Sequence, residues 1–210
     1  MSIVITVRRL ALLPLVLLAL TACGSSPPVH YYALSSPSHP PASGAARMLV
    51  ELLPVVVPER VNHERVVVGG AGDRLDLRDD DQWAAPLADE IRHVVAEALW
   101  QRLRAADVYQ APVASASDRR PQYRLALRIE RFDALPGRSA VVEASWTARK
   151  VPQGPSSICR AGFAAPLVDA TTAAAVAALS DATGRLAEAI ADALARLDQG
   201  IADSCPQGSP

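Results

Sequence analysis

The sequence is poor in the side chains that carry out catalysis or bind metals. Aromatic residues make up 4% of the 210 residues, and there are only three cysteines and four histidines. No His-Glu-x-x-His, Gly-x-Ser-x-Gly or Cys-x-x-Cys spacing occurs. These absences argue against an enzyme, although a catalytic triad assembled in space from distant residues stays open as an alternative.

The chain also lacks an apolar run long enough for a membrane span, because the run from Leu10 to Leu20 is shorter than the roughly 20 residues that a helix needs. Arg8 and Arg9 precede this run and small residues follow it, which is the layout of a secretory signal peptide over residues 1–22. Leu20-Thr21-Ala22-Cys23 then predicts cleavage and acylation of Cys23, as in a bacterial lipoprotein. The alternative is an ordinary signal peptide with a coincidental cysteine.

No strong charge of one sign is present either. Loss of Arg8 and Arg9 with the signal leaves 19 basic and 22 acidic residues, a net charge of −3, which gives no electrostatic basis for nucleic-acid binding. The run Asp79-Asp80-Asp81 has no histidine at ligand spacing and is expected to be a solvated turn before a helix. We therefore expect no metal and no cofactor.

What the chain does contain, after Cys23, is a segment rich in proline and serine. Residues 23–46 are expected to form a tether of about 24 residues between the acyl anchor and the domain. An aromatic and apolar stretch, the island Tyr31-Tyr32-Ala33-Leu34, interrupts this segment and predicts a short strand at a sheet edge. The alternative is an apolar patch in a disordered linker.

Residues 47–200 are expected to fold as one α+β domain, followed by a tail over residues 201–210. Period-two alternation predicts a hairpin of two half-buried strands, and two helical patterns predict long helices packed on one face of a mixed, mostly antiparallel sheet. The glycines near residue 70 favour a hairpin over a phosphate-binding loop. The expected elements are strands 48–57, 64–68, 74–78, 108–111, 122–132, 140–150 and 157–165, and helices 84–103 and 172–197.

With Cys23 assigned to lipid, Cys159 and Cys205 remain as an even pair in an exported chain, so a disulfide between them is a hypothesis. It would join a central strand to the end of the last helix. The alternative is one buried thiol and one thiol in a loose tail.

The order of these signals resembles the ABC-type transport auxiliary lipoprotein family, of the PqiC type. The residues that carry the resemblance are the segment ending at Cys23, the Tyr31–Leu34 island, Leu53-Pro54-Val55-Val56-Val57-Pro58, Trp83, and Pro86-Leu87 at the start of a helix. The family is not enzymatic, so the resemblance supplies no catalytic residues.

The resemblance implies a lipoprotein of the outer membrane that faces the periplasm. Its implied partners are an MCE-type periplasmic protein and an ABC permease complex, in a system that moves lipid between two membranes. Gly24 fits release to the outer membrane, because an Asp there is the usual retention signal in enteric-type bacteria. Tyr31, Tyr32, Leu34 and Trp83 are candidates for a surface that meets a partner or a second copy.

Two other functions remain open at this stage. An outer-membrane assembly lipoprotein of the kind that plugs a lipopolysaccharide-export barrel would share the anchor and the size of the domain. A lipid-anchored periplasmic hydrolase would need a nucleophile brought together by folding.

Overall fold

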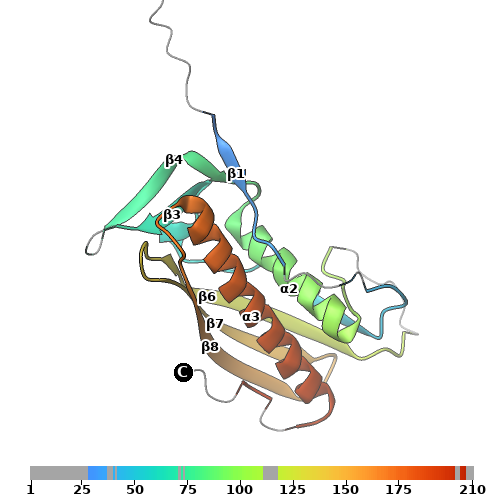
Figure 1. Ribbon diagram of the computed structural model, residues 1–210. Coiled ribbons are helices and arrows are strands. Elements are labelled where there is room, and N and C mark those ends of the chain that lie inside the picture. The colour runs from blue at the N-terminus through green and yellow to red at the C-terminus, as the bar shows by residue number, and fades with distance from the viewer. Residues whose placement is uncertain are drawn as a thin grey trace, which may run out of the picture.

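The computed structural model describes residues 28–36, 40, 42–70, 72, 74–110, 118–201 and 204–206. The signal peptide, Cys23 and His39 lie outside the described residues. Within them the chain forms two sheets and two long helices (Figure 1). The expected α+β class with a single domain is confirmed, with the strands divided between two sheets.

The larger sheet has five strands in the order β5-β2-β6-β7-β8. Its three long strands form an antiparallel meander, whereas β2 lies parallel to both β5 and β6. Period-two burial along the meander confirms the expected half-buried strands, since one face packs in the core and the other meets solvent. The strands are β2 (Met48–Leu52), β5 (Ala105–Asp107), β6 (Gln122–Ala134), β7 (Ser139–Lys150) and β8 (Ser156–Pro166).

The smaller sheet has three strands in the order β1-β4-β3. Strands β3 (Arg65–Gly69) and β4 (Leu75–Trp83) form the hairpin that the glycines predicted. Strand β1 (His30–Tyr32) lies parallel to β4 at the sheet edge, which confirms the short edge strand expected from the tyrosine island.

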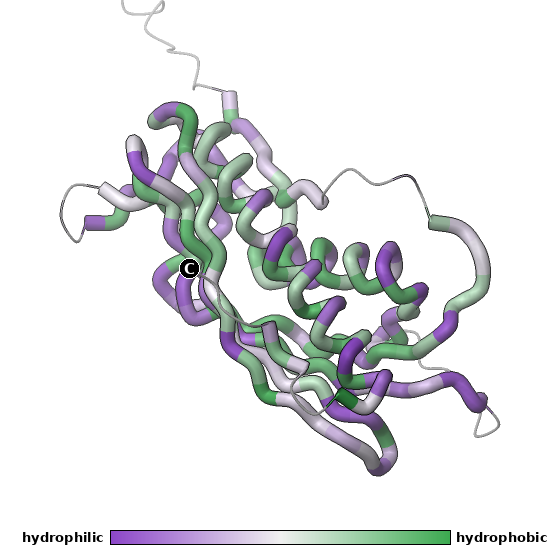
Figure 2. The backbone as a smooth tube through the Cα atoms, turned by 60° about the horizontal axis from the view of Figure 1, so that its bottom comes forward, coloured by the Kyte–Doolittle hydropathy of each residue, from purple (hydrophilic) through white to green (hydrophobic). Residues whose placement is uncertain are grey.

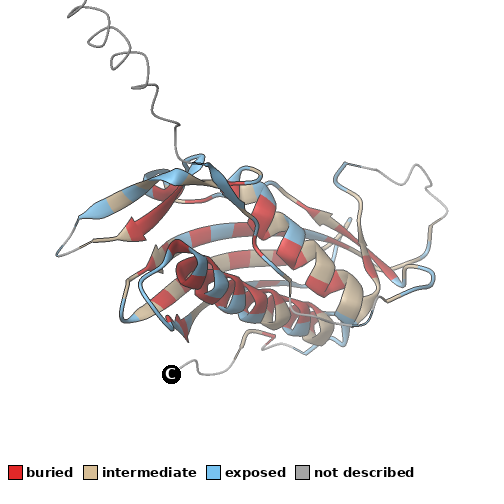
Figure 3. Cartoon of the chain, turned by 45° about the horizontal axis from the view of Figure 1, so that its top comes forward, coloured by how far each residue is buried: buried red, intermediate tan, exposed pale blue. Residues whose placement is uncertain are grey.

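Two helices cover the inner face of the larger sheet: α2 (Leu87–Leu103) and α3 (Thr172–Asp198). The helices pack against each other, and buried residues of α3 face those of the sheet (Figure 3). Hydrophobic and hydrophilic residues alternate along the strands and helices (Figure 2), because each element has one face in the core and one face in solvent. The Thr171 hydroxyl caps α3 by accepting a hydrogen bond from the Ala174 amide at 3.1 Å. The core is mainly Leu, Val, Ile and Ala.

Three expected elements differ from the structure at their ends. The first core strand stops at Leu52, because Pro54 has no amide hydrogen to continue the ladder, and the chain rejoins β6 only through a bridge from Val56 to Arg128. Helix α2 begins after Pro86 rather than at Ala84. It ends at Arg104, whose left-handed φ of 55° turns the chain directly into β5, three residues earlier than the strand expected at 108–111.

The run Asp79-Asp80-Asp81 is not a capping turn but the middle of β4. Side chains on the neighbouring strands pair with two of these carboxylates and make the acidic stretch compatible with a sheet. Arg65 Nη1 lies 2.6 Å from Asp79 Oδ1, and His30 Nδ1 lies 3.2 Å from Asp81 Oδ1. Pairing across strands therefore outweighs the low strand propensity of aspartate.

Candidate anchor segment and docking surfaces

The segment that follows the expected anchor site is built into the domain rather than hanging from it. The backbone amide of Leu34 donates a 2.8 Å hydrogen bond to Glu90 Oε2 on α2. The next amide, of Ser35, donates to Ser180 Oγ on α3 at 3.2 Å. Leu34 itself is only 4% exposed. Residues 30–36 thus belong to the folded unit, and the expected tether over 23–46 is interrupted by this attachment.

The four residues proposed as a partner surface separate into two groups. Leu34 and Trp83 are buried, and the ring of Trp83 meets that of Phe132 edge-on at a centroid distance of 6.4 Å. Tyr31 is 68% exposed, and Tyr32 is half-buried against the core. Leu34 and Trp83 pack in the core and are not available at the surface. The proposed partner surface is therefore reduced to Tyr31 and the exposed part of Tyr32.

Burial and the adjacent Asp81 carboxylate raise the pKa of the Tyr32 hydroxyl. Both effects disfavour the phenolate, so Tyr32 stays neutral at physiological pH and adds no charge beside Tyr31. The exposed part of β1 is therefore an aromatic edge with the His30–Asp81 pair at its start.

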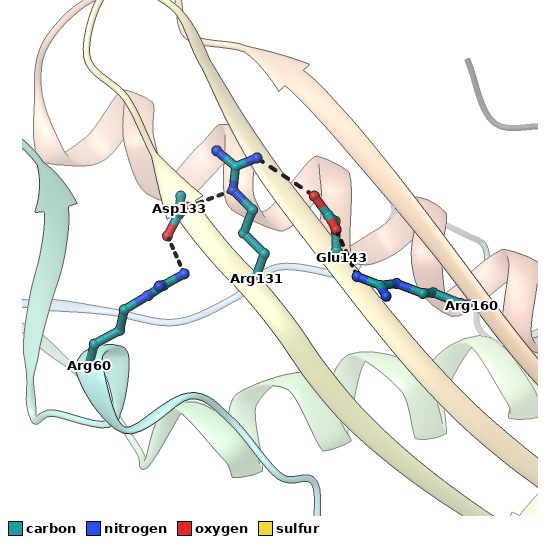
Figure 4. Close-up of polar contacts among 5 residues, drawn as sticks. All are labelled: Arg60, Arg131, Asp133, Glu143 and Arg160. Atoms are coloured by element: carbon teal, nitrogen blue, oxygen red, sulfur yellow. Dashed lines mark hydrogen bonds and ion pairs between the residues drawn. The ribbon is translucent and has the colours of Figure 1, made fainter. Parts of the chain in front are cut away.

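The outer face of the larger sheet, which meets solvent, carries a second surface. A ladder of charged side chains crosses it from the 3-10 turn η1 (Glu59–Val61) to β8 (Figure 4). Asp133 contacts Arg60 at 3.5 Å and Arg131 at 2.6 Å, and Glu143 contacts Arg131 at 3.6 Å and Arg160 at 3.4 Å. Three arginines share two carboxylates, so the ladder is net positive.

A shift in strand register builds this ladder. The β6–β7 pairing slips between Ile129 and Arg131, so that Glu130 and Arg131 are both accessible instead of alternating. Glu130 accepts a hydrogen bond from Ser145 at 2.7 Å, while Arg131 joins the ladder. The hydrogen bond to Asp133 raises the pKa of Arg131, so this guanidinium is charged at every physiological pH. The signal visible in the sequence was the consecutive pair of charges at the end of an alternating strand.

The same face also exposes aliphatic side chains. Ile158 on β8 is 79% exposed and Val56 is 45% exposed, and both line a shallow pocket with Arg128. A mixture of arginine and exposed aliphatic groups is typical of interaction surfaces, where charges give orientation and apolar groups give affinity.

The structure contains the disulfide between Cys159 and Cys205, with a Cα–Cα distance of 5.4 Å. Cys159 lies on β8, which is an edge strand of the sheet and not the central strand expected. The bond holds the chain after α3 against this edge, where Cys205 Sγ lies 3.4 Å from the Ile158 carbonyl oxygen. The tail therefore shields part of an edge that would otherwise be open to pairing.

No candidate metal centre occurs among the described residues. No group of three His, Cys, Asp or Glu side chains there is placed to hold a metal ion. His63 and His93 are exposed, and His30 pairs with Asp81. In this part of the chain, neither helix has the length and apolarity needed to cross a bilayer.

The fold is a single α+β domain whose N-terminal segment, residues 30–36, is part of the folded unit. The model of the ABC-type transport auxiliary lipoprotein component matches residues 32–191, and the chain belongs to this family. The resemblance inferred from the sequence is thereby confirmed, and the family is a transport component rather than a class of enzyme. No curated protein matches the chain by sequence.

Two solved structures are similar in fold. A crystal structure of an uncharacterised protein has a TM-score of 0.63 at 17% identity, covering 79% of this chain and 97% of that chain. The crystal structure of protein XCC0632 from Xanthomonas campestris, of family DUF330, has a TM-score of 0.62 at 19% identity, covering 81% of this chain and 97% of that chain. At these identities the likeness concerns the fold alone.

Proposed function

We propose that the chain is a lipoprotein anchored by Cys23 to the outer membrane, facing the periplasm, where it serves as the auxiliary component of an ABC/MCE-type intermembrane lipid transport system. Its role is to dock the end of the transport path against the outer membrane. The family match over residues 32–191 carries the proposal, because it covers nearly all of the folded domain. The segment Leu20–Cys23 supplies the anchor.

The attachment of residues 30–36 supports a docking role in physical terms. A lipid needs a sheltered apolar path across water, so the component at the membrane end must hold a fixed position relative to the bilayer. Hydrogen bonds from Leu34 and Ser35 to the two helices transmit the position of the anchor to the whole domain. No catalytic step belongs to this role.

Fractionation of a Cys23→Ser variant tests the anchor. The variant is expected to fold and to leave the outer-membrane fraction in high salt, because salt screens contacts through charged side chains but does not release inserted acyl chains. Wild-type protein washed in the same high salt is the matched control. If the serine variant still sediments with outer membrane after the wash, Cys23 is not the anchor.

Cross-linking in cells tests the partner. A photo-reactive residue at position 31 on β1 or at position 158 on β8 samples the two exposed surfaces separately, since both native side chains are largely accessible. Recovery of an MCE-type protein from either position supports the proposal and identifies the docking face. Recovery of an integral β-barrel from both positions would favour the assembly-lipoprotein alternative instead. A covalent homodimer band would identify contact between copies of this chain.

A further inference from the structure

A cationic cleft lies between the β3–β4 hairpin and the turn that joins β6 to β7. Two adjoining pockets share Gly69 and Leu135 as part of their walls, and Pro136 and Ala170 close one side. Arginines dominate the charged side chains of the lining: Arg60, Arg74, Arg78, Arg131 and Arg138. Among the described residues of the lining, the acidic side chains are Asp76 and Asp133. The cleft is strongly positive in a mature chain whose net charge is −3.

Pairing inside the cleft leaves two arginines uncompensated. Arg74 contacts Asp76 at 2.9 Å, and Asp133 serves both Arg60 and Arg131. Arg78 and Arg138 have no carboxylate partner among the described residues.

Arg78 is the more constrained of these two. Its Nε atom is shielded from solvent and has no hydrogen-bond acceptor in the described part of the chain. A shielded guanidinium donor without an acceptor is costly, because it has lost water and gained nothing in return. Both Arg78 and Arg138 line the second pocket, where an oxyanion with several acceptor atoms, such as phosphate, could accept hydrogen bonds from the two guanidinium groups together.

The cleft lies toward the anchor-side end of β1. Strand β1 is parallel to β4 with His30 opposite Asp81, so the chain that leads back to Cys23 leaves β1 at the end nearer Arg78. Arg78 precedes Asp81 by three residues, about 10 Å along a strand. Six residues separate Cys23 from His30, and the seven residue-to-residue steps limit that stretch to about 25 Å. The anchor therefore keeps lipid headgroups within reach of the cleft.

The first pocket adds an apolar group to the cleft. Leu75 on β4 is 39% exposed and lines this pocket with Arg60, Arg74 and Arg131. Arg78 lies on the opposite side of the strand, because successive side chains alternate, and lines the second pocket with Arg138.

We propose that this cleft binds the phosphate group of an anionic phospholipid, in the same membrane that holds the acyl anchor, through the guanidinium groups of Arg78 and Arg138. The choice of membrane rests on the anchoring proposed above. The site would orient the domain by adding a second, non-covalent contact to the single covalent attachment, at the high effective concentration that a short tether provides.

Vesicle flotation with the unlipidated Cys23→Ser chain tests the site, using phosphatidylcholine alone or mixed with phosphatidylglycerol. Binding is expected only to the anionic vesicles. Arg78→Gln and Arg138→Gln should each weaken it about fivefold, the usual effect of one basic residue near an anionic surface. Arg138 is in an exposed turn, so its variant keeps the test valid even if Arg78→Gln is unstable.

Arg149→Gln is the matched control, because Arg149 is exposed, has no carboxylate partner among the described residues, and lies at the far end of β7 from the turn. It removes the same charge and should leave flotation unchanged. An equal loss with Arg149→Gln, or none with the two cleft variants, overturns the site.

Competition with inorganic phosphate distinguishes a site for lipid headgroups from a site for free phosphate. Flotation that persists in millimolar phosphate supports a lipid ligand, whereas phosphate binding without flotation overturns the membrane assignment. Because the assay needs neither the acyl anchor nor a transport partner, its failure would leave the fractionation and cross-linking results standing.

Discussion

Substitution of Leu34 by alanine should destabilise the whole domain and not only its N-terminal edge. Leu34 is 4% exposed and belongs to the same hydrophobic core as both helices. Removing three buried carbons from such a site costs about 2–5 kcal/mol. We expect about 2–3 kcal/mol, because the segment is short and connects to the domain on one side only, so part of the cavity can collapse.

Urea denaturation of the unlipidated chain measures this cost, and Val29→Ala is the matched control. Val29 lies one residue before β1 and is 43% exposed, so its truncation should change the free energy of unfolding by less than about 0.5 kcal/mol. Hydrogen exchange gives a second measure, since the Leu34 and Ser35 amides donate to Glu90 and Ser180 and should exchange slowly in the wild type.

Equal effects of Leu34→Ala and Val29→Ala would refute the reasoning. So would fast exchange of the Leu34 amide in the wild type, because an amide bonded to a buried carboxylate should open only when the segment detaches. Either result would return residues 30–36 to the role of a loose tether.

Two further predictions concern the far end of α3. Loss of the Cys159–Cys205 bond in Cys205→Ser should cost about 4 kcal/mol on the chain-entropy model for a separation of 46 residues. The cost is measured as a lower urea midpoint without reductant. Equal midpoints for the oxidised wild type and the variant would contradict this prediction. Tyr123→Phe should cost about 1.5 kcal/mol, because the Tyr123 hydroxyl donates to Asp198 at 2.6 Å. Burial, together with this hydrogen bond and the Asp198 charge, raises the pKa of Tyr123 in the folded state. The stability that the neutral Tyr123 hydroxyl contributes is therefore complete below the unfolded-state pKa of about 10, and it is lost progressively as the pH rises from there toward the folded-state pKa. Wild-type stability should therefore fall more steeply than that of Tyr123→Phe above pH 10, and parallel stability curves would contradict this cause.

The alternating strands and the two helices were predictable because their signals are local. In β6 and β7 each inward side chain is two residues from the next, and the burial follows this spacing without a break up to the register shift at Ile129. The cap of α3 at Thr171 is equally local. Such periodicity requires no knowledge of which segments meet.

The features that the sequence did not predict depend on contacts between distant residues. The acidic run 79–81 is part of a strand because Arg65 and His30 lie opposite it. The tyrosine island is fixed by groups 56 and 145 residues away in sequence. In the cleft, Arg78 and Arg138 are 60 residues apart, and neither is unusual in its own neighbourhood. Propensity and spacing carry no information about such pairs.

The attachment of β1 also changes how far the domain can stand from its membrane. A free tether of about 24 residues would reach about 80 Å, whereas the seven residue-to-residue steps from Cys23 to His30 reach at most about 25 Å. With Cys23 acylated, that end of the domain is therefore held near the bilayer surface and cannot travel across the periplasm to collect lipid. Under the proposed function, a partner would therefore have to bring its lipid path to this protein, and it would meet a face whose orientation is set by the attachment of residues 30–36.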